Sequence, residues 1–239
     1  MFYSLSNAVC LVFMSMLLSG VVVAAQGSTP SSAFGQAYSL ESGELLYTER
    51  HQALPNRQHS VVYAEPDGQV FARKQIDFSQ SLIRPSFQQL NQRNGEYIKV
   101  AQQGDSFLVS YRESTDTEEE TERISDQTNM VIDAGFDAFV RQYWQALMTG
   151  KAMDIDYLVP SKQTTFSFRF QQASCLAGTP ANAVCFTLSP VSWLVKLAVD
   201  PIVVAYDKGQ QQLLRFTGRA NISNAEGKYQ SVDIRYQYD

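Results

Sequence analysis

The chain has 239 residues with 19 basic and 24 acidic side chains, a formal net charge of −5 and 44% hydrophobic residues. That length allows one large domain or two small ones with a real hydrophobic core. The acidic balance argues against nucleic acid as a partner, and it leaves no polybasic patch for anionic lipid head groups.

The first 25 residues contain no Lys, Arg, Asp or Glu, and residues 8–23 form an apolar stretch. Small residues at Val23 and Ala25 suit signal peptidase, so residues 1–25 are predicted to be a signal peptide, although a basic n-region is missing. An uncleaved membrane anchor is the alternative, but about 16 apolar residues are short for a span of roughly 20. Cys10 lies inside the apolar stretch, which argues against a lipoprotein. We expect no stable membrane insertion after cleavage.

Residues 26–35 are small and polar and indicate a flexible leader. Residues 36–239 predict a single, mainly β domain of about ten to eleven strands, joined by tight turns such as 65–68 and 94–95. Strands joined by short turns pair antiparallel, and no βαβ unit recurs. The run 113–126 carries seven acidic residues and predicts a solvated acidic loop. A calcium site is the alternative, but the spacing and the glycine of an EF-hand are absent.

The clearest helix is predicted at about 134–149, where apolar residues recur at the helical period and form one broad stripe. Asp137 and Arg141 fall on the opposite side, Asp133 is placed to cap the start, and Gly150 is placed to cap the end. A second, short helix is possible at 190–198. The long helix needs a large partner surface, so the sequence predicts a curved antiparallel sheet or half-open barrel wrapped around it.

Aromatic side chains are concentrated on this helix and on the strand at about 165–171. A strongly curved sheet around one helix rarely fills completely, so these side chains are predicted to line an apolar cavity. Plain core packing is the alternative for each of them. The predicted cavity residues are Phe136, Phe139, Tyr143, Trp144, Phe166, Phe168 and Phe170.

After signal cleavage only Cys175 and Cys185 remain, ten positions apart around a loop-like segment. In an exported chain this spacing predicts a structural disulfide. A redox pair or a metal site is the alternative, but neither a CxxC motif nor a histidine partner accompanies the cysteines. We predict neither a metal nor a cofactor.

None of the catalytic or nucleotide-binding motifs GxSxG, HExxH, P-loop and GxGxxG is present in the sequence. Glu49 and His51 are two positions apart on a predicted strand, so they share a face and are candidates for proton transfer. The alternative is a polar cluster near a strand end, and the spacing of His51 and His59 does not favour zinc. Arg84 is a third polar candidate, although no partner in the sequence supports it. We therefore predict a binding protein rather than an enzyme.

The exported leader, the long run of antiparallel strands and the amphipathic helix in mid-chain together resemble the LolA/LolB-type periplasmic lipoprotein carriers. The stretch PIVVAYDKG at 201–209, with LLRFTG at 213–218 and the final alternating strand, looks like the end of their sheet. The layout is also similar to uncharacterised periplasmic half-barrel proteins of Gram-negative bacteria. The resemblance implies a periplasmic half-open barrel whose helical lid holds acyl chains. The acidic loop and the disulfide loop depart from the carriers, and no binding residue carries over.

These patterns lead to the expectation of a periplasmic protein that holds an apolar ligand between sheet and helix. The ligand would be a lipid, an acyl chain or an acylated protein. One alternative is a cofactor-free enzyme, which the resemblance allows because a related half-barrel acts in pigment biosynthesis; Glu49, His51 and Arg84 would be its first candidates. Another is an envelope scaffold that binds a protein through a sheet edge or the acidic loop.

Overall fold

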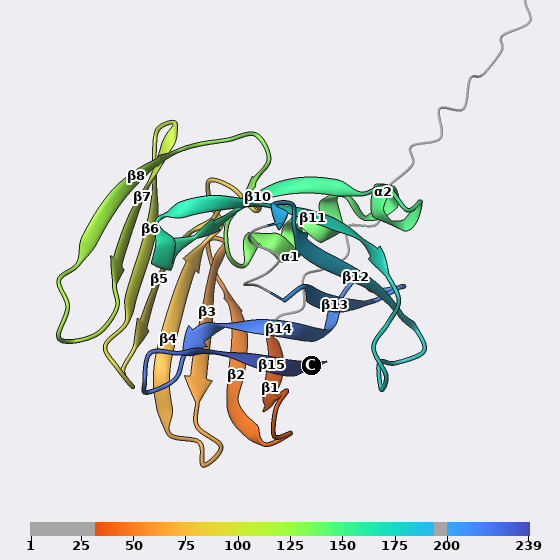
Figure 1. Cartoon of the computed structure of the whole chain (residues 1–239), viewed down its shortest axis with the longest axis horizontal. Coiled ribbons are helices and arrows are strands. Elements are labelled where there is room, and N and C mark those ends of the chain that lie inside the picture. The colour runs from red at the N-terminus through yellow and green to blue at the C-terminus, as the bar shows by residue number, and fades with distance from the viewer. Residues whose placement is uncertain (1–31, 194–199) are drawn as a thin grey trace, which may run out of the picture.

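The computed structural model describes residues 32–193 and 200–239 (Figure 1). The predicted signal peptide 1–25 and part of the predicted helix 190–198 lie outside these ranges. Strand β1 (Ser32–Ser39) begins inside the predicted leader 26–35, because Ala33 and Gly35 already pair with strands on both sides. The sheet therefore includes residues that were predicted to belong to the leader.

The described residues form one large curved sheet of 15 strands with two short α-helices. The sheet order is β8-β7-β6-β5-β4-β3-β2-β1-β15-β14-β13-β12-β11-β10-β9, and every neighbouring pair is antiparallel except β9 and β10. The strands after β1 are β2 (Leu45–Leu54), β3 (Gln58–Ala64), β4 (Val70–Asp77), β5 (Ser86–Asn91), β6 (Tyr97–Gln103), β7 (Ser106–Arg112), β8 (Glu120–Ser125), β9 (Met130–Val131), β10 (Met153–Val159), β11 (Thr164–Ala173), β12 (Ala183–Pro190), β13 (Ile202–Asp207), β14 (Leu213–Ser223) and β15 (Tyr229–Tyr238).

The predicted number of ten to eleven strands is too low, and the acidic run shows one reason. Residues 113–126 are not one loop, because residues 120–125 form β8 and pair with β7 along their whole length. An edge strand needs backbone hydrogen bonds but little apolar surface, so a strand without an apolar pattern escapes detection by alternation. The two-residue strand β9 is too short to show any periodicity.

The sheet curls until strands that are distant in its order touch. The β14–β15 hairpin reaches β5 and β6 (Figure 1), where the Asn91 amide donates to the Ser223 carbonyl at 2.8 Å. The Ser223 hydroxyl in turn donates to the buried Glu96 carboxylate at 3.0 Å. On another side, the Gln163 amide donates to the Val109 carbonyl of β7 at 3.1 Å, next to a 3₁₀ turn (Pro160–Lys162). These contacts make the open sheet barrel-like.

The predicted long helix consists of two short ones, α1 (Gly135–Gln142) and α2 (Trp144–Met148). They are separated at Tyr143, whose φ of −102° and ψ of 14° are not helical. Gly150 has a φ of 82°, and its N–H donates to the Leu147 carbonyl, which confirms its place at the C-terminal end.

The start of α1 is held differently from the prediction. Asp133 does not cap the helix, because its carboxylate accepts two hydrogen bonds from the buried Lys74 ammonium, at 2.8 and 2.9 Å. Lys74 lies on the inner face of β4 between apolar neighbours, where an unpaired charge would be costly. A Cβ on Gly135 would lie 2.0 Å from the Ile83 carbonyl oxygen, so only glycine fits at this close approach.

Cys175 and Cys185 form the predicted disulfide, with an S–S distance of 2.06 Å. It closes the loop between β11 and β12, and a disulfide is consistent with an oxidising, exported compartment. Within the described residues, no helix is both long and apolar enough to cross a membrane.

Candidate functional site

The predicted cavity residues lie together, but they fill the space between helix and sheet. Phe170 is fully buried, and its ring centroid lies 5.1 Å from that of Phe136 and 5.2 Å from that of Phe186. Only Phe136, Tyr143 and Phe166 keep partial exposure. One buried cluster contains Phe136, Phe139, Tyr143, Trp144, Phe166, Phe168 and Phe170. We call this set the aromatic cluster; as described, it is packed core with an accessible rim.

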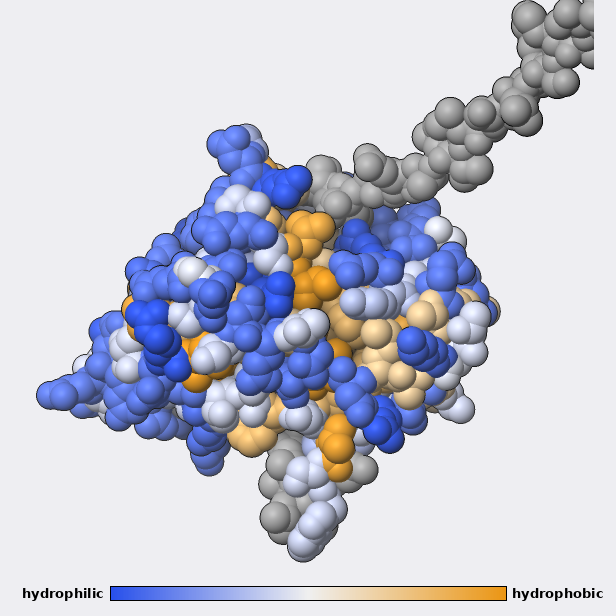
Figure 2. All heavy atoms as spheres, turned by 90° about the horizontal axis from the view of Figure 1, so that it is seen from above, coloured by the Kyte–Doolittle hydropathy of each residue, from blue (hydrophilic) through white to orange (hydrophobic). Residues whose placement is uncertain are grey.

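The opposite side of α1 faces the sheet as well, because α1 lies within the curve of the strands (Figure 1). Asp137 and Arg141 pair with each other on this side, and the charge of His51 acts on Asp137. Asp137 and Arg141 lie opposite the apolar stripe, as predicted, but their side chains are only 34% and 27% exposed. On the face seen from above, apolar side chains gather in a band between polar ones (Figure 2).

A polar cluster forms opposite α1 because β1 carries only small side chains on its inner face. Gly35 of β1 pairs with Glu49 of β2 on one side and with Tyr236 of β15 on the other. The Tyr236 hydroxyl donates to the Glu49 carboxylate at 2.5 Å, across a strand that presents no side chain between them. In the next row, Ala33 separates His51 from Tyr238. The inner polar cluster, as we use the term, comprises Glu49, His51, Asp137, Arg141, Tyr206, Tyr236 and Tyr238.

The two carboxyl groups of the inner polar cluster differ in their electrostatics. Burial alone would raise the pKa of Glu49, but contacts with His51 and Tyr236 and the charge of Lys74 more than offset it, so the pKa of Glu49 is lowered. His51 Nε2 lies 3.3 Å from Glu49 Oε1. For Asp137 burial dominates over its Arg141 partner, and the pKa of Asp137 is raised.

Several buried polar atoms next to α1 lack a hydrogen-bond partner among residues 32–193 and 200–239. They are the Tyr206 hydroxyl, Asp137 Oδ1 and Arg141 Nε, although Tyr206 and Asp137 lie close enough for a contact that, beside the larger effect of burial, acts to lower the pKa of Asp137 and to raise that of Tyr206. Buried polar groups are normally hydrogen-bonded, and an exception marks an internal water, a ligand or a functional position. The inner polar cluster is therefore the strongest candidate for polar contacts with a molecule bound inside the sheet.

Lowering the pH from 7 to 5 is expected to reduce the free energy of unfolding by about 1–2 kcal/mol through His59. Burial, with a smaller contribution from the charge of His51, lowers the pKa of His59 from 6.5 to about 4. The unfolded chain then takes up the proton first, so stability is complete above pH 6.5 and falls as the pH approaches 4. Guanidinium unfolding of wild type and His59→Gln at both pH values measures this. An equally steep loss in His59→Gln would contradict it.

Gly35→Ala is expected to destabilise the protein by about 1–3 kcal/mol, since its Cβ enters occupied space. That atom would lie 2.7 Å from Glu49 Cγ and 3.0 Å from Tyr236 Cε1. Gly209→Ala is the matched control, because its Cβ would meet only an Asp207 oxygen at 3.4 Å. Urea unfolding compares the two variants, and equal losses would show that the space above Gly35 is not critical.

Arg84 lies apart from the other two polar candidates. Its guanidinium binds Asp126 at 2.9 Å and the Gln127 carbonyl at 3.1 Å, and it thereby holds the segment between β8 and β9. The structure thus joins Glu49 with His51 and assigns Arg84 a separate contact. Tyr206, Tyr236 and Tyr238 were missed in the sequence, where they appear only as members of strands.

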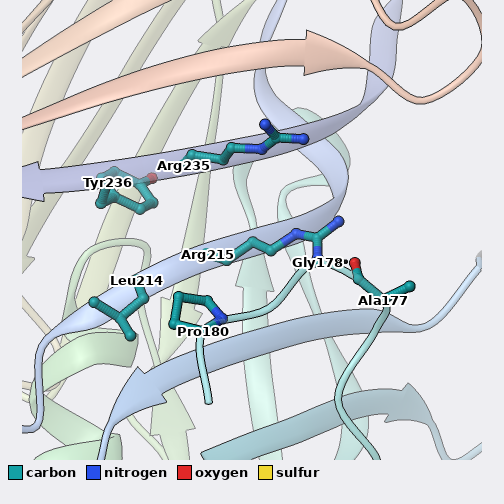
Figure 3. Close-up of a pocket in the computed structure, with 7 residues that line it drawn as sticks. All are labelled: Ala177, Gly178, Pro180, Leu214, Arg215, Arg235 and Tyr236. Carbon is teal, nitrogen blue, oxygen red and sulfur yellow. Dashed lines mark hydrogen bonds between the residues drawn. The ribbon is translucent and has the colours of Figure 1, made fainter. Parts of the chain in front are cut away.

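Two cavities of the described structure lie away from the aromatic cluster. The larger, of about 290 Å³, lies between the disulfide loop and strands β14 and β15 (Figure 3). Arg215 and Arg235 line it, but both bind the Asp233 carboxylate, and Arg215 also donates to the Ala177 carbonyl. The other, of about 170 Å³, is lined by Arg93 and its partner Glu65 among others. Neither cavity leaves a guanidinium unpaired for a ligand. Residues 32–193 and 200–239 contain no group of three or more potential metal ligands.

Comparisons with known proteins bear on the fold alone. No protein-family model and no curated protein matches the chain. Among solved structures, the chain is similar to a beta-barrel-like protein of the domain of unknown function DUF1849 from Brucella abortus. The TM-score is 0.50 at 8% identity, over 88% of this chain and 95% of that chain. The likeness supports a barrel-like fold for this protein.

Proposed function

We propose that the protein is an exported, periplasmic binding protein that holds a lipid, an acyl chain or an acylated protein against the concave face of its sheet. This proposal rests on the position of the segment 135–148, which contains α1 and α2, against the sheet. Its aromatic side rests on the aromatic strands, and its polar side meets the inner polar cluster. An amphiphilic molecule that replaced this segment would find apolar and polar surface in the same arrangement. The layout resemblance to the LolA/LolB-type carriers supports the same function.

Ligand uptake then requires α1 and α2 to move, because the aromatic cluster is filled while they are in place. The helices contain eight and five residues. Isolated helices shorter than about 12–15 residues are marginal in water, so this segment depends on its packing for its structure. A ligand that takes over the packing surface competes with the segment directly. The partly exposed Phe136, Tyr143 and Phe166 mark the point of entry.

Native mass spectrometry of protein purified gently from periplasm, together with titration of N-phenyl-1-naphthylamine, tests this function. We expect a retained lipid and a saturable rise in fluorescence that oleate reverses. Phe136→Asp and Phe166→Asp are expected to weaken probe binding at least about tenfold, because each puts a charge on the apolar rim. Leu40→Asp is the matched control, since Leu40 is 49% exposed and lies outside the aromatic cluster. Absence of lipid and of saturable binding, or equal loss in the control, would contradict the proposal.

A cofactor-free enzyme is the second candidate, favoured by the contact of His51 with Glu49. The side chain of His51 is 26% exposed and that of Glu49 is 2% exposed, so a ligand in the concavity would reach the imidazole. This arrangement suits a general base held by a carboxylate. Bound lipid would be incubated with wild type or His51→Gln and its chemical structure compared. Conversion that depends on His51 would favour the enzyme, and unchanged lipid would favour the carrier.

A further inference from the structure

One edge of the sheet is long and open, and the other is short. β9 ends the sheet with two buried residues. β8 ends it with six residues, all exposed except Ile124, which is partly buried. Within the described ranges no strand pairs with the outer side of β8, which lies at the left rim in Figure 1. β8 therefore offers unpaired backbone N–H and C=O groups along its length.

The hydrogen-bond pattern identifies which backbone groups of β8 face outward. Ser125 lies opposite Ser106, and the Asp126 N–H donates to the Asp105 carbonyl at 3.0 Å. Asp126 and Asp105 are therefore a hydrogen-bonded facing pair. In an antiparallel ladder such pairs alternate with facing pairs that share no hydrogen bond, and Ser125 with Ser106 is a pair of the second kind. The backbone groups of Thr121, Arg123 and Ser125 therefore point away from β7, toward the free edge.

Of the usual devices that protect an edge strand, β8 carries only charge. It contains neither proline nor glycine, and its register with β7 is continuous without a bulge. What remains is negative charge, since residues 113–126 contain seven acidic side chains and Arg123 is their one basic residue. Glu120 and Glu122 share a face with Ile124, which packs on the core.

The negative charge around β8 determines which kind of chain segment can pair with this edge. A second copy of the chain would place carboxylates opposite carboxylates, which destabilises cross-strand pairs. Residues 1–31 of the chain contain no Lys or Arg, so they offer no complementary charge. An extended segment with Lys or Arg at alternate positions would complement Glu120 and Glu122 and satisfy the outward backbone groups.

We propose that β8 binds an extended, basic segment of a partner protein by strand addition. Main-chain hydrogen bonds to Thr121, Arg123 and Ser125 supply affinity, and the alternate basic side chains supply specificity. The interaction uses neither the aromatic cluster nor the inner polar cluster. It therefore stands independently of the proposed ligand-binding function.

Titration of the full mature chain with a fluorescent nine-residue peptide, in which Lys or Arg alternates with Val, tests this surface. The matched probe is the same peptide with alternate amides N-methylated, which keeps the charge but removes strand hydrogen bonds. We expect saturable binding of the first peptide and at least about tenfold weaker binding of the second, since several hydrogen bonds are lost. Equal binding of both peptides would show simple electrostatic adhesion and overturn strand addition.

Variants locate the binding to β8. Thr121→Pro removes one outward N–H and keeps the backbone ladder to β7, although it also removes the 2.9 Å hydrogen bond between the Thr121 and Ser110 hydroxyls; we expect about threefold to tenfold weaker peptide binding. Glu120→Gln with Glu122→Gln is expected to weaken it by a similar factor. Glu41→Gln with Glu44→Gln is the control, because both are exposed on the β1–β2 turn. If Thr121→Pro fails to fold, the charge variants and the N-methylated peptide still decide. Unchanged affinity in the β8 charge variants would overturn the proposal.

Discussion

Lys74→Met is expected to destabilise the protein by about 3–5 kcal/mol, because it leaves the Asp133 carboxylate without its partner inside the sheet. The side chain of Lys74 is 2% exposed and that of Asp133 is 13% exposed. Lys74 Nζ lies 2.8 Å from Asp133 Oδ1. The double variant Lys74→Met/Asp133→Asn is expected to recover part of the loss, since no unpaired charge remains. Asparagine also tolerates the φ of 44° at position 133.

Guanidinium unfolding of the two single variants and the double variant gives the coupling between Lys74 and Asp133. Arg169→Met is the matched control, because Arg169 pairs with Asp154 at the same distance of 2.8 Å but both side chains are about half exposed. No measurable loss is expected there. If Lys74→Met were as mild as Arg169→Met, the pair would not be what holds the start of α1.

Phe170→Ala is expected to cost about 3–5 kcal/mol, the range for removing a fully buried phenylalanine. Phe170 is 0% exposed and contacts the rings of Phe136, Phe139 and Phe186, so its removal leaves a cavity between helix and sheet. Phe166→Ala, on the same strand face but partly exposed, is the comparison and should cost much less. Urea unfolding measures both. Similar small losses would mean that the aromatic cluster is not packed as core.

The sequence predicts the strands best where turn residues and alternation agree. A turn is present around Asn94 and Gly95, but it connects β5 and β6 through residues 92–96 and is not the predicted two-residue turn; Gly95 has a φ of 82°, and its N–H donates to the Asn91 carbonyl. The turn 65–68 closes through a hydrogen bond from the Gly68 N–H to the Glu65 carbonyl. β8 was missed because its pairing needs no apolar face. What lies opposite the polar side of α1 could not be predicted, because helical periodicity identifies an apolar side but not what covers the polar one.

The candidate site was only half predictable for a related reason. Glu49 and His51 are two positions apart, so their shared face follows from strand geometry. Tyr236 lies 187 positions from Glu49, and their hydrogen bond depends on which strands flank β1. No local pattern contains that pairing. A glycine within a strand often marks the close approach of other groups, but Gly35 falls in the predicted leader 26–35 and only the structure places it in β1.

The pairing of β1 with β15 has a consequence for how the protein reaches its native state. Ala33 lies opposite Tyr238, so the middle of the sheet joins the two ends of the described chain. Loop-closure entropy makes contacts between such distant residues slow to form. Hairpins within β1–β8 and within β10–β14 can form early. These two parts of the sheet are joined only when β15 pairs with β1 and β14. The sheet therefore stays incomplete, with β1 and β14 each lacking a neighbouring strand, until β15 has formed.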